Sequence, residues 1–383
     1  MQDQQEELST IIKRIQTFDL PQVDIKELCS PCPSVSLTET LSQLNSKDNS
    51  CILDVRSESE FAESSIPGAH NIPLFNDEER HNVGLLFKQQ SIPLAEQVGA
   101  YYAYKKQEAF LNKIKKWAGN RQIIVHCWRG GYRSKATTAL LIKNGFNAVR
   151  LEGGHKAFRR EVYRTLYETP INLVSLSGKT GSGKSEILEF IQENHPEIPV
   201  LHIEAAANHA SSVFGPSRFY GSPVNSQQDF ETRLYIQLVK YKKDDGTFPT
   251  FLTEKESAQI GKVHIPNGIL DELKKEQHIQ IESSLSSRVK RAYREYVEGA
   301  DSEKLTMLRD QIQYLKRYLS NESLEEYLNL FDLRNWDTLL EKVLVEYYDL
   351  VYRTIATSPI ATVKHEDTKT AVSEILKIFS KYS

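Results

Sequence analysis

One cysteine near the middle of the chain has neighbours that suit a nucleophile. Cys127 follows the apolar stretch 123–125, and a helix-forming pattern begins at Ser134. A loop between a strand and the start of a helix directs backbone N–H groups and the positive end of the helix dipole at its centre. Such surroundings favour a thiolate and hold an anion above it. We therefore predict that Cys127 is a catalytic nucleophile acting on an oxyanion, and not a structural cysteine. Its anion-binding loop is predicted to comprise Trp128, Arg129, Gly130, Gly131, Tyr132, Arg133 and Ser134.

A second loop fits the phosphate-binding pattern G-x-x-x-x-G-K-[ST] without a mismatch. It comprises Gly178, Lys179, Thr180, Gly181, Ser182, Gly183, Lys184 and Ser185. An apolar stretch at 171–176 precedes it and a helical pattern at 185–192 follows it, which is the strand, loop and helix order that the motif requires. The glycines let the backbone wrap a phosphate, Lys184 neutralises charge, and the Ser185 hydroxyl can hold Mg²⁺. The pattern predicts a phosphate-binding site. It does not indicate which phosphate compound binds there or whether that compound is hydrolysed.

Residues that support this loop are less clearly marked. A P-loop that uses Mg²⁺ normally has an acidic residue at the end of a neighbouring strand. Glu254 is the Walker B-like candidate, and Glu204 is an alternative. Because the usual aspartate is missing, we predict that this domain binds a nucleotide or a diphosphate, and we do not predict that it hydrolyses the ligand. The polar stretch 208–230 is predicted to be a lid or substrate-binding loop; His209 within it is a candidate contact or a plain surface histidine.

The composition describes an ordinary globular chain. Its 383 residues allow two or three domains, and 26% charged and 39% hydrophobic residues are typical values. There is no apolar run of the roughly 18 residues that a membrane span needs, and the stretch 1–7 has no features of an export signal. Four scattered cysteines suit a reducing compartment. We expect a cytoplasmic protein without a membrane partner.

Two clusters of basic residues are candidate contacts for a polyanion. The net charge of −3 argues against indiscriminate nucleic-acid binding, yet it leaves room for a local basic face. Solvated helix faces are the alternative interpretation of both clusters. The candidate residues are Arg150, Lys156, Arg159 and Arg160 beside the cysteine loop, and Arg288 and Arg291 further along the chain.

Strands alternating with helices predict an α/β protein with parallel sheets. We expect a polar helical extension at 1–33, a first α/β domain at 34–168, a P-loop α/β domain at 169–285, and a helical region at 286–383 that packs on the P-loop domain. Cys29 and Cys32 form a single C-x-x-C pair. This pair lacks the second ligand pair of a structural zinc site. We therefore interpret it first as a proline-bounded turn, and metal binding or redox activity is the second interpretation.

Several motifs together resemble a known family. Asp54-Val55-Arg56-Ser57, Glu60-Phe61, the run 66–73 and the Cys127 loop are similar to a rhodanese domain. A rhodanese-like domain joined to a P-loop NTPase-like domain, with the loop 127–131 reading Cys-Trp-Arg-Gly-Gly, resembles the bacterial tRNA 2-selenouridine synthases over about 34–295. Two segments depart from the family pattern. Residues 210–212 read Ala-Ser-Ser where Arg-Gly-Ser is usual, and Lys255 stands where an aspartate is usual.

The resemblance implies a selenotransferase with an associated geranyl transfer. Its reaction would replace sulfur by selenium at C2 of wobble 2-thiouridine, in tRNA for lysine, glutamate and glutamine. Selenophosphate would be the selenium donor, and geranyl diphosphate would supply an S-geranyl intermediate. The resemblance further implies that Cys127 carries selenium as a perselenide beside Arg129 and Arg133. A selenophosphate supplier is an implied partner; no tightly bound cofactor is implied, with Mg²⁺ the one candidate ion.

Other functions fit the same motifs. The residues 126–134 also satisfy the H-C-x-x-G-x-x-R-[ST] signature of cysteine-dependent phosphatases, to which a phosphate-binding domain would be an accessory. A rhodanese-type sulfurtransferase is a further alternative, as is ATP-linked sulfur transfer to another acceptor. A non-catalytic scaffold is the alternative from a different class, although Cys127, Lys184 and Ser185 together argue against it.

Overall fold

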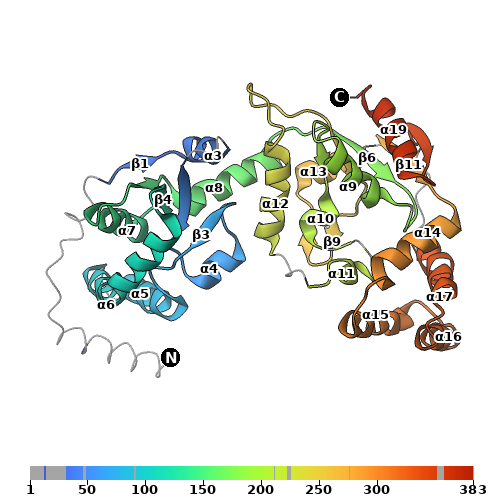
Figure 1. The fold of residues 1–383 in the computed structure, drawn as a ribbon, viewed down its shortest axis with the longest axis horizontal. Coiled ribbons are helices and arrows are strands. Elements are labelled where there is room, and N and C mark those ends of the chain that lie inside the picture. Colours follow the sequence, from blue (N-terminus) through green and yellow to red (C-terminus); the bar gives the residue numbers. More distant parts are fainter. Residues whose placement is uncertain are drawn as a thin grey trace. The chain divides into compact units, whose positions relative to one another are not determined.

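The chain divides into two compact units. A computed structural model describes residues 13, 32–45, 49–89, 92–210, 212–221, 226–275, 277–351 and 358–382. The first unit covers Met1–Glu161 and the second covers Val162–Ser383 (Figure 1). The predicted extension at 1–33, including Cys29, lies almost wholly outside the described residues. No helix in the described ranges combines the length and the apolar character needed to cross a membrane.

The first unit is built on a parallel sheet. Its described strands are β1 (Ser34–Val35), β2 (Ser50–Asp54), β3 (Ala69–Asn71), β4 (Gln122–His126) and β5 (Ala148–Leu151), in the order β1-β5-β4-β2-β3. The central strands β2 and β4 are almost entirely buried, as expected for strands that helices cover on both faces. Because the strands are parallel, β2 and β4 both deliver polar residues to the same edge, where Asp54 lies opposite His126.

Helices connect these strands and complete the core. They are α3 (Leu37–Asn45), α4 (Glu58–Glu63), α5 (Asp77–Gln89), α6 (Ile92–Ala118), α7 (Tyr132–Lys143) and α8 (Gly154–Tyr163). Phe110 and Ile114 of α6 pack with Leu53 and Val125 of the sheet in one apolar cluster. The edge of this cluster includes Cys127, which follows β4 directly.

The second unit contains another parallel sheet. Its strands are β6 (Leu173–Ser177), β7 (Val200–Leu201), β8 (Phe251–Glu254), β11 (His278–Glu282) and β12 (Ala361–Lys364), in the order β12-β11-β6-β8-β7. A short antiparallel pair, β9 (Gln259–Ile260) and β10 (Val263–His264), stands apart from it. The P-loop strand β6 is central, so the carboxyl ends of β8 and β11 flank the phosphate loop.

Helices of the second unit cover this sheet and form a separate apolar cluster. Those around the sheet are η1 (Arg164–Glu168), α9 (Lys184–Asn194), α10 (Ile203–Ala207), α12 (Gln227–Val239), α13 (Asn267–Leu273) and α19 (Thr368–Phe379). The others are α11 (Gly215–Arg218), α14 (Leu285–Ala292), η2 (Tyr293–Val297), α15 (Ser302–Tyr314), η3 (Leu315–Arg317), α16 (Asn321–Asp332), α17 (Trp336–Lys342), η4 (Val343–Tyr348) and α18 (Asp349–Val351).

The predicted fold class is confirmed, with two differences in the second unit. The region after 285 is not purely helical, because β12 returns to the sheet and α19 packs on it with α9. The four residues of β12 are too few to show a period of two, so the sequence did not reveal this strand. The stretch 208–230 is not structureless: α11 lies within it and α12 begins at Gln227, with 211 and 222–225 outside the described residues.

Candidate functional sites

Cys127 lies at the bottom of the loop that the sequence predicted. The loop begins where β4 ends, and α7 begins at Tyr132 after the N-cap Gly131. The first N–H groups of a helix have no acceptor within it, so those of α7 are available to an anion. The Cys127 sulfur lies 3.2 Å from the Ser134 hydroxyl oxygen. Only 4% of the cysteine is exposed, and its other side borders the apolar cluster.

A tight turn at the start of α8 holds this loop in place. The N–H groups of His155 and Lys156 donate to the carbonyls of Cys127 and Trp128, at 2.9 and 2.8 Å, and the Trp128 ring stacks on His155 with 5.3 Å between centroids. Gly154 has a φ of +57°, and a Cβ on it would lie 2.5 Å from the Gly130 nitrogen. The loop and the turn therefore fit together only because position 154 is a glycine.

Arg150 and Arg133 are already engaged by the protein. Arg150 donates to the Gly130 carbonyl at 2.7 Å, so it supports the loop and is a weaker candidate for an RNA contact. Arg133 donates to both carboxylate oxygens of Glu60, at 2.6 and 3.1 Å. Burial alone would lower the pKa of Arg133, but Glu60 and the nearby Cys127 raise it. Arg133 is therefore held in an ion pair with Glu60, and its role in the anion-binding loop stays a prediction.

Glu60 is itself fixed on its helix. It accepts a hydrogen bond from the Ser57 N–H at 3.1 Å, within a capping box at the start of α4. Burial favours the neutral acid, yet the hydrogen bonds and charge of Arg133 keep the pKa of Glu60 below its usual value. Two other predicted loop residues remain open to solvent, since Arg129 is exposed and Tyr132 is 50% exposed. These two side chains form the rim of the site.

A buried polar layer lies behind the cysteine loop. Asp54 accepts hydrogen bonds from the Arg56 guanidinium at 2.6 to 3.1 Å, and both residues are almost fully buried. His126 lies 3.5 Å from the Asp54 carboxylate. Burial outweighs the attraction of Asp54 and lowers the pKa of His126 to about 4, so the imidazole is neutral at pH 7. The charges of the Asp54 carboxylate and the Arg56 guanidinium cancel each other, and His126 beside them is neutral.

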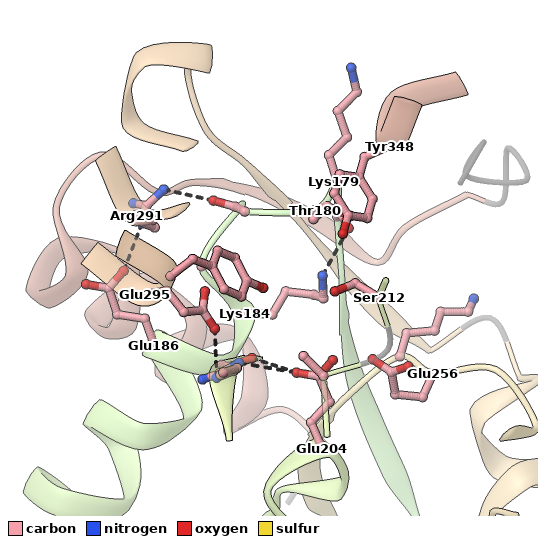
Figure 2. Close-up of a pocket in the computed structure, with 18 of the residues that line it drawn as sticks. Lys179, Thr180, Lys184, Glu186, Glu204, Ser212, Glu256, Arg291, Glu295 and Tyr348 are labelled. Atoms are coloured by element: carbon pink, nitrogen blue, oxygen red, sulfur yellow. Dashed lines mark hydrogen bonds and ion pairs between the residues drawn. The ribbon is translucent and has the colours of Figure 1, made fainter. Parts of the chain in front are cut away.

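The P-loop borders a large polar cavity of about 580 Å³. Its lining includes all of the predicted loop residues except Ser182. Figure 2 shows Lys184, Glu204 and Ser212 around this cavity, with Lys179 and Tyr348 on another side. The Lys184 ammonium donates to the Gly178 carbonyl at 3.1 Å. Ser212 and Lys255, which lie in the two segments that depart from the family pattern, both line the cavity.

The two Walker B-like candidates, Glu204 and Glu254, lie next to each other beside the P-loop. The Ser185 hydroxyl donates to Glu204 at 3.0 Å, which makes the alternative candidate the direct neighbour of the loop. Glu254 accepts from the Glu204 N–H at 2.7 Å. Burial first, and then the charge of Glu204, raise the pKa of Glu254 to about 8. Glu204 therefore lines the cavity, and Glu254 is buried behind it.

His202 completes this group of buried residues. Its Nε2 lies 3.8 Å from Glu254 Oε1. Burial lowers the pKa of His202 to about 4. Burial therefore disfavours the charged forms of both the imidazole and the carboxyl at this contact. One ligand atom from each of His202, Glu204 and Glu254 lies within 4.8 Å of the others.

Two predicted RNA contacts instead support the P-loop. Arg288 is 4% exposed; it donates to the Thr180 carbonyl at 2.8 Å and to both oxygens of Asp349. Arg291 donates to Glu186 at 2.8 Å and lines the cavity. Neither guanidinium lies on an open basic face, which corrects their assignment. A buried arginine with a bidentate partner is indistinguishable in sequence from an exposed one.

The remaining predicted residues are dispersed. His209 is partly buried and packs closely against Gly215 and Gly261, so it is neither a plain surface histidine nor part of the cavity lining described above. Lys156 and Arg160 are exposed on α8, and Arg159 is partly buried there. These three remain candidates for contact with RNA.

The contacts of some residues at the two sites could not be predicted from the sequence. Glu60 belonged to a recognised motif but had no predicted partner. His365 lies 183 positions from its contact, where its Nδ1 is 2.8 Å from the Ser182 carbonyl. His202 follows a strand of two residues, which is too short to mark its end. Such contacts become visible only once the strand order is known.

The fold and sites define a class: a rhodanese-like unit followed by a P-loop unit. Residues 36–161 match the rhodanese-like domain, and residues 171–381 match the AAA domain of tRNA 2-selenouridine synthase. The chain belongs to the tRNA 2-selenouridine synthase family.

Curated relatives that bear the name tRNA 2-selenouridine synthase include proteins from three different bacteria. The relative from Alcanivorax borkumensis is 31% identical over 85% of this chain and 94% of its own length. That from Hydrogenovibrio crunogenus is 30% identical over 79% of this chain and 88% of its length. That from Nitrosomonas europaea is 33% identical over 64% of this chain and 63% of its length.

Proposed function

We propose that this protein is a tRNA 2-selenouridine synthase that uses geranyl diphosphate and selenophosphate. It exchanges the sulfur at C2 of a wobble 2-thiouridine for selenium, in tRNA for lysine, glutamate and glutamine. The P-loop unit binds the diphosphate of the prenyl donor. The Cys127 loop binds selenophosphate, and Cys127 reacts with it. The observation that carries the proposal is the presence, in one chain, of a thiol between a strand and the start of a helix and of a cavity lined by a complete P-loop sequence.

The first half-reaction is an alkylation. The C2 sulfur of 2-thiouridine attacks C1 of the geranyl group, the C1–O bond breaks, and diphosphate leaves. Lys184 and the P-loop amides stabilise the charge of the leaving group. Mg²⁺, if bound at Ser185, adds charge neutralisation. The S-geranyl group converts the thiocarbonyl sulfur into a thiolate leaving group for the next step.

A small apolar cavity beside the phosphate cavity supports a prenyl substrate. It is bounded by residues of α15, α16 and α17, and Tyr296 belongs to the lining of both cavities. The Tyr296 ring lies 5.9 Å from that of Phe214, which in turn contacts Tyr348. The apolar cavity measures about 30 Å³, so these rings must separate to admit the hydrocarbon chain.

Electron balance decides how Cys127 acts on selenophosphate. Selenium in this donor is already fully reduced, so forming a cysteine perselenide would reduce phosphorus to phosphite. In the balanced route the Cys127 thiolate attacks phosphorus, the S–P bond forms, and the P–Se bond breaks to release hydrogen selenide anion. That anion attacks C2 of the S-geranyl base, and geranyl thiolate leaves. Water then hydrolyses the phosphocysteine to phosphate.

Two features of the loop suit this route. Ser134 lies close enough to donate a hydrogen bond to the sulfur when the thiolate is released again. The paired Arg133 and the N–H groups of α7 supply positive potential for the phosphoryl oxygens. Replacing the implied perselenide by phosphocysteine keeps Cys127 as the catalytic residue and changes only the atom that it attacks.

Product analysis tests the proposed function. Purified protein is incubated with 2-thiouridine tRNA and geranyl diphosphate, with selenophosphate added later. Nucleoside mass spectrometry should show S-geranyl-2-thiouridine first and 2-selenouridine only after the second addition. Absence of both nucleosides would refute the proposal. Peptide mass spectrometry after an acid quench distinguishes the routes, because a perselenide on Cys127 has the isotope pattern of selenium and phosphocysteine does not.

A cysteine-dependent phosphatase remains the second candidate. The 3.2 Å contact between Ser134 and Cys127 favours it, since a hydroxyl at this place assists the departure of the thiolate from phosphocysteine. Release of phosphate from an aryl phosphate, at a rate exceeding that from selenophosphate, would favour this function. A rhodanese-type sulfurtransferase would instead form a persulfide from thiosulfate.

A further inference from the structure

We propose that His202, Glu204 and Glu254 form a binding site for one divalent cation that accepts nitrogen as well as oxygen ligands, with Mn²⁺ as its representative. The sequence predicted Mg²⁺ beside Ser185, and it did not single out His202. The proposal depends on the geometry of the second unit alone. It holds or fails independently of the group that the protein transfers.

The sheet topology brings the three residues together. β7 and β8 are parallel neighbours with Leu201 opposite Thr253. His202 directly follows β7, Glu204 lies two residues further on α10, and Glu254 ends β8. Because the carboxyl ends of parallel strands share one edge, their side chains meet beneath the P-loop. The ligand atoms lie within 4.8 Å of one another, which is a spacing that a small adjustment converts into first-row metal coordination.

Two ligand atoms of the group have no hydrogen-bond partner among the described residues. They are Glu254 Oε2 and His202 Nε2, and both side chains are at least 98% buried. The Glu204 N–H occupies only Glu254 Oε1. A buried polar atom without a partner is costly, and native proteins rarely leave two of them side by side. A cation between them would satisfy both.

The charges around the group are compatible with a bound cation. Arg218 approaches Glu204 at 3.4 Å and Ser185 donates to the same oxygen, so one carboxylate is partly compensated without a metal. No positive group contacts Glu254 Oε2 among the described residues. Glu204 also lines the phosphate cavity. A cation held here would therefore lie beside a phosphate bound in this cavity.

The ligand set favours a first-row transition ion over Mg²⁺. Carboxylates suit Mg²⁺ and Mn²⁺ alike, whereas an imidazole suits transition ions. The competing interpretation is an acidic pair that shares a proton and binds no metal. In that case Glu254→Gln would leave cation binding unchanged, because the amide could take the place of the protonated carboxyl.

Cation binding to the metal-stripped full-length chain tests the site. Equilibrium dialysis with elemental analysis, together with the electron paramagnetic resonance of free Mn²⁺, should give one tightly bound Mn²⁺ per chain. Glu254→Gln and His202→Gln should each weaken this binding by about tenfold or more. His202→Gln should weaken Mn²⁺ binding more than Mg²⁺ binding. Glu256→Gln is the matched control, because Glu256 lines the same cavity outside the group, and it should leave Mn²⁺ binding unchanged.

Three results would overturn the proposal. One is that the parent chain binds no Mn²⁺; another is that Glu254→Gln and His202→Gln bind it as the parent does. The third is that Glu256→Gln weakens binding as much as they do. Thermal unfolding without metal shows whether a variant is folded. A folded Glu254→Gln chain that has also lost the stabilisation by Mn²⁺ supports the site.

Discussion

Arg133 holds Glu60 through two hydrogen bonds, from the start of α7 to the first turn of α4. The two residues are 73 positions apart in the sequence, and their pair places a guanidinium near the thiol. An arginine that is already paired keeps its position when the anion is absent. The loop is therefore preorganised for its substrate.

Breaking this pair should destabilise the first unit. Arg133→Leu removes the bidentate partner of the largely buried Glu60 carboxylate and leaves it the more distant Arg80, 3.8 Å away. The change should cost about 2 kcal/mol, less than for a fully buried pair, because both side chains keep some solvent contact. The double variant Glu60→Gln/Arg133→Leu should lose less than the sum of the single variants. Urea unfolding measures all three. Arg309→Leu is the control, because it breaks an exposed pair with Asp332, and it should cost under about 1 kcal/mol. If the double variant lost as much unfolding free energy as the two single variants together, the prediction would be contradicted.

A methyl group at position 154 should disable the cysteine loop. In Gly154→Ala the new Cβ meets the Cys127 carbonyl and the Gly130 nitrogen, and the loop must move. Gly119→Ala is matched to it, because Gly119 has a φ of +59° but open space around its Cβ position. We expect Gly154→Ala to lose at least about 90% of selenium incorporation, since a displacement of about 1 Å costs on the order of a hundredfold in rate. Equal activities of the two variants would refute this account of the turn.

His126 should make the first unit sensitive to acid. The folded pKa of about 4 lies below the ordinary 6.5, so its contribution to stability is complete above pH 6.5 and is lost as the pH falls through 4. The difference corresponds to about 3 kcal/mol. His126→Gln should therefore lose less stability than the parent between pH 7 and pH 4. Urea unfolding at both pH values provides the test, with the exposed His81→Gln as control; parallel losses in the parent and His126→Gln would count against it.

The P-loop should depend on the strand that returns from the C-terminal region. A Cβ at Gly183 would lie 2.5 Å from His365 Nδ1 and 3.0 Å from Arg291 Nε. Gly183→Ala should therefore weaken the binding of inorganic diphosphate by about tenfold or more, measured by titration calorimetry. Gly246→Ala has a similar φ of +85° with open space and should bind as the parent does. Unchanged affinity in Gly183→Ala would show that His365 does not position the loop.

Features formed by residues close together in the chain could be predicted from the sequence. The order of strand, loop and helix around Cys127 and around Lys184 could be predicted, because each motif and its two flanking elements lie within about 20 residues. The pairing of Arg133 with Glu60 and of Arg288 with Asp349 could not, since charge alone does not distinguish a paired arginine from an exposed one. The strand β12 and the His202 group depend on strand order, which short strands with mixed polarity do not disclose.

The most direct test separates the two half-reactions with two single variants. Cys127→Ala and Lys184→Ala are each given 2-thiouridine tRNA, geranyl diphosphate and selenophosphate, and the nucleosides are quantified by mass spectrometry. Cys127→Ala should accumulate S-geranyl-2-thiouridine without 2-selenouridine, whereas Lys184→Ala should leave 2-thiouridine largely unmodified. Formation of 2-selenouridine by folded Cys127→Ala at the rate of the parent chain would contradict the central role of this thiol.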